Sequence, residues 1–195
     1  MSSSIVRDIG SHCAVLCTAL LLAGCAVSSE PVQVAHDRSS GKTTYETRQM
    51  RLEDIQMGSG LGQKSRFYAK VSGTCLGEDC APSQFTLSFI KEGPQEVTVE
   101  GRDVTLTVGS ETLQWEDAQT RETNQTATIR SGVFARVRLS SKQLSTVAAA
   151  STLRGTACGE RFTLPHETRA PVRDLLVRLD QRAGGDSGRS SGKMR

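Results

Sequence analysis

The chain has 195 residues, enough for one domain with extensions at its ends. Apolar residues make up 36% and aromatic residues 4%, so we expect a modest core built mainly from Val, Leu and Ala. The net charge of +3 is scattered along the chain, which argues against nucleic acid as a partner. With only three His residues and no dense acidic cluster, the composition predicts no cofactor, no metal centre and no charged catalytic centre.

Residues 13–24, CAVLCTALLLAG, form an apolar run near the amino terminus. A membrane-spanning helix needs roughly 20 such residues, so this run is too short to cross a bilayer. Its length and its small-residue end are typical of the apolar region of an export signal. We therefore predict a signal peptide over residues 1–24.

The run ends in Leu22-Ala23-Gly24-Cys25, which resembles the lipobox of bacterial lipoproteins. The resemblance implies diacylglycerol transfer to the sulfur of Cys25, cleavage just before Cys25, and acylation (palmitate) of the new amino group. Two or three acyl chains hold a protein stably at a membrane. In a cell with two membranes, Ala26 by resemblance favours the outer one, with the protein facing the periplasm. An ordinary cleaved signal or a buried apolar segment are the alternatives.

Both ends of the mature chain, residues 25–42 and 183–195, lack the hydrophobic periodicity of a strand or helix. Residues 25–42 are rich in Ser, Pro and Gly and predict a flexible tether, in which His36 is a solvated side chain. Residues 183–195 are Gly/Ser-rich and mildly basic, which predicts a disordered tail. An electrostatic contact of this tail with anionic lipid or cell wall is the alternative.

Residues 43–182 predict a single β-rich domain. Apolar and polar residues alternate along Phe85–Phe89, Val104–Val108 and Val133–Leu139, the pattern of strands with one buried face. Further strands are predicted, and the full set is 44–55, 65–74, 84–91, 125–130 and 132–139, a three-stranded meander over 96–117, and a hairpin of 152–157 and 160–164.

Two helices are predicted after these strands. Ser140 and Gln143 form a capping box that starts the first. The second has Pro171 in its first turn and an apolar stripe at Val172, Leu175, Leu176 and Leu179. The predicted fold class is mainly β, with α+β as the alternative: an antiparallel β-sandwich or partly rolled sheet with two helices near the carboxyl end.

Three cysteines of the mature domain remain. Cys75 and Cys80 flank four residues between two predicted strands, which predicts a disulfide in an oxidising compartment. Pairing of either with Cys158 is left open; otherwise Cys158 is a small, partly buried thiol. A zinc site from the three cysteines with His166 is the alternative, but the spacing of these four residues fits no common zinc finger.

No sequence motif points to catalysis. There is no GxSxG, HExxH or Walker loop. The candidate contact surface is one face of a predicted strand, carrying Arg130, Phe134, Arg136 and Arg138. It is either a solvated face or a surface for an anion, a glycan or a protein partner.

We therefore predict a lipid-anchored protein of the cell envelope that is not an enzyme. Its β domain would serve as a binding or structural module, with the membrane and an envelope protein or glycan as partners. The alternatives are a subunit of a larger envelope assembly and an envelope enzyme or redox protein using Cys158 or His166.

Overall fold

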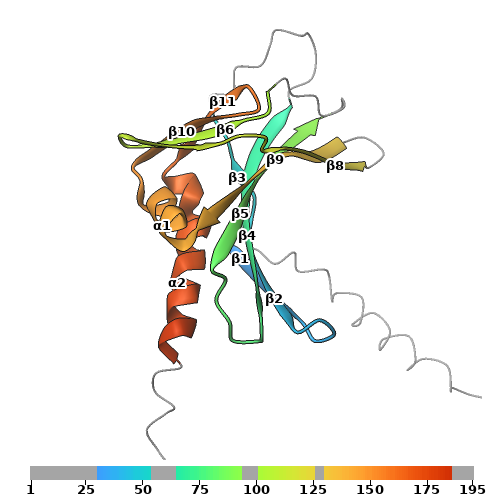
Figure 1. The fold of residues 1–195 in the computed structure, drawn as a ribbon, viewed down its shortest axis with the longest axis vertical. Helices are drawn as coiled ribbons and strands as arrows, with labels where there is room; N and C mark the ends of the chain where they lie inside the picture. The colour runs from blue at the N-terminus through green and yellow to red at the C-terminus, as the bar shows by residue number, and fades with distance from the viewer. Residues whose placement is uncertain (1–29, 54–64, 94–100, 126–129, 186–195) are drawn as a thin grey trace, which may run out of the picture. The chain divides into compact units, whose positions relative to one another are not determined.

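The computed structural model describes residues 30–53, 65–93, 101–125 and 130–185 (Figure 1). The predicted signal peptide, the lipidation site Cys25 and the tail after residue 185 lie outside the described residues. Neither helix of the described part combines the length and the hydrophobicity that a membrane crossing requires. The folded part belongs to one unit, Pro31–Arg195, and consists mainly of antiparallel strands.

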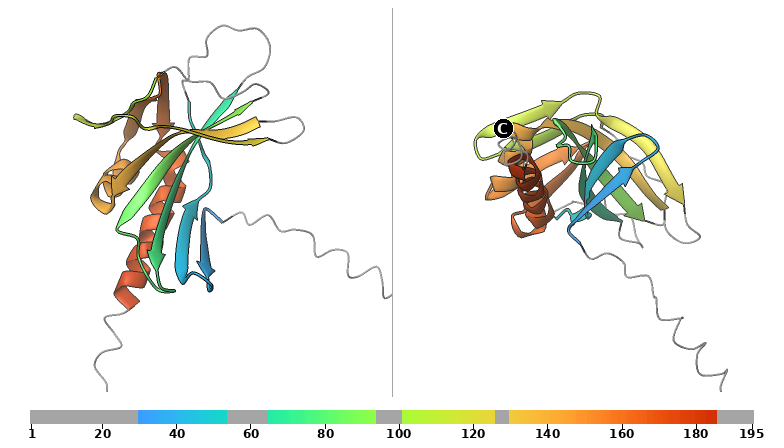
Figure 2. Two further views of the ribbon diagram at one scale, coloured as in Figure 1. Left: turned by 45° about the vertical axis from the view of Figure 1, so that its right-hand side comes forward. Right: turned by 90° about the horizontal axis from the view of Figure 1, so that it is seen from below.

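Two antiparallel sheets form this unit (Figures 1 and 2). The larger sheet has the strand order β1-β2-β4-β5-β9-β8, and β3 also pairs with β4. The smaller sheet has the order β11-β10-β6-β7. The strands are β1 (Val32–Asp37), β2 (Lys42–Thr47), β3 (Met50–Arg51), β4 (Arg66–Leu76), β5 (Gln84–Gly93), β6 (Val104–Val108), β7 (Glu111–Trp115), β8 (Gln119–Gln125), β9 (Arg130–Ser140), β10 (Thr152–Ala157) and β11 (Glu160–Pro165). This confirms the predicted mainly β fold class.

Backbone hydrogen bonds join the two sheets on both sides. On one side Glu53, just after β3, exchanges two bonds of 2.9 Å with Thr163 of β11. On the other side Arg136 of β9 donates to Ala118, and Gln119 donates to Arg102 just before β6. The sheets therefore form a sandwich-like shell whose strands are tied together at both margins.

Aromatic rings fill the space between the sheets. Phe134 lies edge-on to Phe67 with ring centroids 5.9 Å apart, and Phe89 contacts Phe162 of the smaller sheet at 5.2 Å. Helices α1 (Ser141–Ala149) and α2 (Ala170–Gly185) add Leu144, Val147, Val172, Leu175 and Leu179 to the same core. α2 packs against α1, β1 and β2, so it covers one end of the larger sheet (Figure 1).

Helix starts and most strands follow the predictions. Ser140 caps α1 through the predicted capping box, and α2 begins one residue before Pro171. The first strand of the predicted meander falls outside the described residues, while its other two are β6 and β7. The strand predicted over 125–130 is misplaced, because the strand before β9 is β8, whose sequence QTRETNQ carries no apolar alternation.

The predicted tether over 25–42 is too long. Val32–Asp37 is strand β1, paired with β2 from Val32 opposite Thr47 to Asp37 opposite Lys42. Val32 is fully buried, so the core begins at the first residue of this strand. His36 is also more than a solvated side chain, since its Nδ1 lies 2.9 Å from the hydroxyl of Thr43 on β2.

Candidate functional site

The predicted disulfide between Cys75 and Cys80 is present, at the end of β4. The two Cα atoms are 5.9 Å apart, within the range that a disulfide needs. Cys158 is free and buried, so neither cysteine pairs with it.

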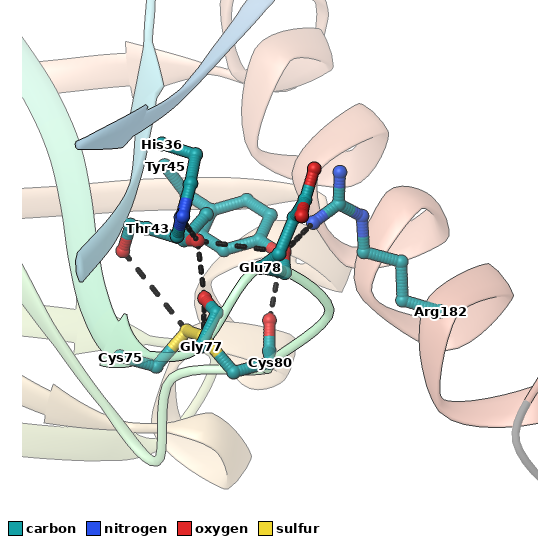
Figure 3. The surroundings of a disulfide bond; sticks show 8 residues. All are labelled: His36, Thr43, Tyr45, Cys75, Gly77, Glu78, Cys80 and Arg182. Atoms are coloured by element: carbon teal, nitrogen blue, oxygen red, sulfur yellow. Dashed lines mark hydrogen bonds between the residues drawn. A yellow bond between two sulfur atoms is a disulfide. The ribbon is translucent and has the colours of Figure 1, made fainter. Parts of the chain in front are cut away.

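Hydrogen bonds connect the disulfide loop to the β1–β2 hairpin (Figure 3). The amide of Gly77 donates to the carbonyl of Gly41 at 2.8 Å, and the hydroxyl of Thr43 donates to the carbonyl of Gly77. Because this hydroxyl has a single proton, it can only accept from His36, so Nδ1 of His36 carries a proton.

The other side of the disulfide loop holds the last turns of α2 (Figure 3). The hydroxyl of Tyr45 donates to the carbonyl of Cys80 at 2.6 Å and accepts from Arg182 at 2.8 Å. Arg182 also donates to the carbonyl of Glu78 at 2.9 Å, and its guanidinium lies 5.4 Å from the ring centre of Tyr45. We call Cys75, Cys80, Tyr45 and Arg182 the disulfide clasp. It ties together β2, the β4–β5 loop and α2.

The disulfide clasp is a stabilising device, and its removal should have a measurable cost. Replacing both cysteines, Cys75→Ser with Cys80→Ser, is expected to lower the free energy of unfolding by about 2 kcal/mol, the value for a closed loop of this length. Urea denaturation of the two proteins measures the difference.

A matched control lies in the same loop. Leu76 is 75% exposed, so Leu76→Ser should change the free energy of unfolding by less than about 0.5 kcal/mol. A double-serine variant as stable as Leu76→Ser would show that the disulfide contributes nothing to the fold.

Of the predicted surface of Arg130, Phe134, Arg136 and Arg138, the structure supports Arg136 and Arg138 and contradicts Phe134. Phe134 is 2% exposed and lies among the core aromatics. The cause is a β-bulge: Phe89 pairs with Ala135 and Ile90 with Val133, which leaves Phe134 as the extra residue and turns it inward. Arg130 is the first residue of β9, opposite Gly93 of β5.

Arg136 and Arg138 do share the outer face of the larger sheet. The register places Lys70, Ser88 and Arg136 side by side, and Ser72, Thr86 and Arg138 in the next row. Lys70 forms an ion pair with Glu46 of β2. We call this set the polar face: Glu46, Lys70, Ser72, Thr86, Ser88, Arg136 and Arg138. All of these side chains are partly or fully exposed, whereas their sequence neighbours point into the core.

The charges on the polar face are held in fixed geometry. Arg136 donates through both terminal nitrogens to the carboxylate of Glu122 on β8. This pairing lowers the pKa of Glu122 below its ordinary value, so the carboxylate stays charged at neutral pH. The carbonyl of Arg138 accepts from the indole of Trp115 at 3.1 Å, which fixes the backbone beneath its side chain. The polar face therefore presents hydroxyls and charged side chains on the outer side of the larger sheet, groups suited to hydrogen-bonding a polar partner.

Cys158 and His166 are not brought together. They lie beyond opposite ends of β11, a strand of six residues that spans about 20 Å. Cys158 is 1% exposed, and burial, followed by the charge of Asp103, raises the pKa of its thiol. Reactive thiols are exposed and have lowered pKa values, so this environment disfavours a nucleophile. In the described parts of the chain, no three His, Cys, Asp or Glu side chains are grouped so that they could hold a metal ion.

One structurally important residue was not suggested by the sequence. Arg169 is fully buried, and it donates from Nε to the carbonyl of Pro165 at 3.2 Å and from its terminal nitrogens to the carbonyls of Val147 and Ala150. The last two carbonyls end α1, where backbone acceptors have no partner within the helix. Arg169 therefore holds the end of α1 against the segment that leads into α2.

Comparison with known proteins adds no further assignment. No protein-family model matches the chain, and no curated protein and no solved structure matches it either.

Proposed function

We propose that the protein is a lipid-anchored module of the bacterial cell envelope that acts by binding or by structural support and not by catalysis. The observation that carries the proposal is the lipobox-like Leu22-Ala23-Gly24-Cys25 after an apolar run of export-signal length. Acylation of Cys25 would hold the β domain at a membrane, the outer one facing the periplasm where the cell has two membranes.

The disulfide supports an exported location independently of the signal. Disulfides form and persist in oxidising compartments and are rare in the cytosol. The bond between Cys75 and Cys80 is integrated into the fold, because the carbonyl of Cys80 accepts from Tyr45, which in turn accepts from Arg182. A fold that uses a disulfide in this way fits a protein that matures outside the cytosol.

The polar face supports the binding role. It is a partly exposed face of the larger sheet with hydroxyls, two arginines and a Lys–Glu pair, and it suits a glycan or a polar protein surface. The same face would serve a subunit of a larger envelope assembly. A photo-crosslinking side chain at Ser88 distinguishes a protein partner from a glycan in intact cells, because a protein partner gives a protein adduct and a glycan does not.

The anchor is tested by one substitution. Cys25→Ala removes the only thiol of the lipobox and is expected to move the protein from the membrane to the soluble fraction. Intact mass of the unaltered protein, purified from its native membranes, should fit cleavage before Cys25 plus acyl chains. The matched control is Cys17→Ala, within the apolar run, which should leave both fractionation and mass of the mature protein unchanged. Retention of Cys25→Ala in the membrane would contradict the proposal.

A further inference from the structure

The start of the fold is closer to the predicted lipid anchor than the sequence suggested. Strand β1 begins at Val32, so only six residues, 26–31, separate it from Cys25. Seven residue steps span at most about 25 Å, whatever conformation they take. A domain of this size is about 40 Å across, so the tether is shorter than the domain it holds.

We propose that the side of the domain where β1 begins is its membrane-facing surface, and that the β6–β7 hairpin on the smaller sheet points away from the bilayer. This inference rests on the proposed lipidation of Cys25. The occupant of the surface is the lipid headgroup layer, and the argument for it is the length of chain between the anchor and the fold.

The residues that would meet the headgroups are fixed by hydrogen bonds to the start of the fold. The amide of Arg48 donates to the carbonyl of Pro31 at 2.9 Å, and Thr47 pairs with Val32. Arg48 and Arg51 are both exposed there, and their charges favour anionic headgroups. In every orientation that the tether allows, the start of β1 stays within about 25 Å of Cys25 and so close to the bilayer.

The opposite surface is not restrained in this way. β1 is an edge strand of the larger sheet, whereas β7 is an edge strand of the smaller one. Figures 1 and 2 show the β6–β7 hairpin projecting away from β1. The hairpin can therefore stand a full domain width from the headgroups, where a partner in the envelope can reach it.

Energy transfer to labelled lipids tests the orientation. Gln49→Cys and Ser110→Cys each add one exposed thiol, next to Arg48 and in the β6–β7 turn respectively, while the native Cys158 is buried and does not compete for the label. Each full-length lipidated protein carries a fluorophore at the new thiol and is placed in vesicles of phosphatidylethanolamine and phosphatidylglycerol with acceptor-labelled headgroups. We expect about twofold or more higher transfer from position 49 than from position 110, given the lengths of tether and domain.

A longer tether provides the control. Inserting about 20 Gly/Ser residues after Ser28 should remove the difference between the two positions, because the domain can then turn freely. Equal transfer from both positions with the native tether would overturn the inference. Failure of the protein to float with the vesicles is a different result: it would overturn the proposed anchor itself.

Discussion

Replacing Arg169 with alanine is expected to lower the free energy of unfolding by about 3 kcal/mol or more, which for a domain of this size lowers Tm by roughly 10 °C. The substitution removes three hydrogen bonds, and it leaves the carbonyl of Val147 without this donor, while the carbonyl of Ala150 keeps its contact with Nδ1 of His166 at 3.1 Å. Hydrogen bonds from a charged group contribute more than neutral ones, and an unsatisfied buried carbonyl carries a full desolvation cost. Thermal and urea denaturation measure the loss.

The neighbouring arginine serves as the matched control. Arg173 makes one described hydrogen bond, to the carbonyl of His166 at 2.8 Å, and it is partly exposed. Arg173→Ala should cost about 1 kcal/mol or less. If Arg169→Ala is no less stable than Arg173→Ala, the buried guanidinium does not hold α1 in place.

The contribution of Arg169 to the free energy of unfolding should not depend on pH in the neutral range, although its side chain is buried. Burial, and secondarily the charge of Arg173, lowers the pKa of Arg169 from its ordinary value. A lowered pKa of a basic group means that its charged form is less favoured in the folded state. Any pH dependence of the free energy of unfolding from this group would therefore appear only in the alkaline range. Arg remains protonated in proteins, and the loss in Arg169→Ala should be the same at pH 6 and pH 8.

The second large effect is expected at Gly155 in the middle of β10. A methyl group there would lie 2.2 Å from the carbonyl oxygen of Thr105 and 2.9 Å from the ring of Phe162. The oxygen belongs to the backbone of β6, so it cannot move without separating the two strands. Gly155→Ala should therefore lower the free energy of unfolding by about 3 kcal/mol, the upper end of overpacking effects.

Gly109 separates this steric effect from the general cost of replacing glycine. It lies in the β6–β7 turn with φ +62° and has no atom within 4 Å of a built methyl group. Gly109→Ala should cost about 1 kcal/mol, because only backbone strain opposes it. Equal losses in the two variants, measured by urea denaturation, would show that the approach of β6 to Gly155 is not a tight contact.

The sequence predicts strands well where one face is buried over several residues. The alternation along β5 and β6, and along β9 from Ala135 onward, predicts both the strands and which residues enter the core. Two edge strands were missed or misplaced for a common reason. β1 has only two Val residues before polar ones, and β8 is polar throughout, so neither carries enough alternation to stand out. Edge strands are held by pairing to a neighbour, which local sequence does not encode.

The candidate site was predicted less completely, and single residues explain why. The spacing of Cys75 and Cys80 predicted their disulfide, but nothing in the sequence connected it to Arg182, 137 residues after Tyr45. Phe134 was assigned to the wrong face because a bulge between Phe134 and Ala135 reverses the alternation for the part of β9 that precedes it. Arg169 stands in the polar segment HETRA, where an arginine is ordinarily solvated, and only the packing of two helices reveals that it is buried.

The bond between Arg182 and Tyr45 also has a consequence for how the chain matures. It links β2 to the last turns of α2, and two further hydrogen bonds between Glu53 and Thr163 join the sheets. Contacts so distant in sequence slow folding, and the contact between Tyr45 and Arg182 cannot form until residue 182 has been made. If the chain is exported from its amino terminus, as the proposed function requires, it would therefore complete its fold only after residue 182 has crossed.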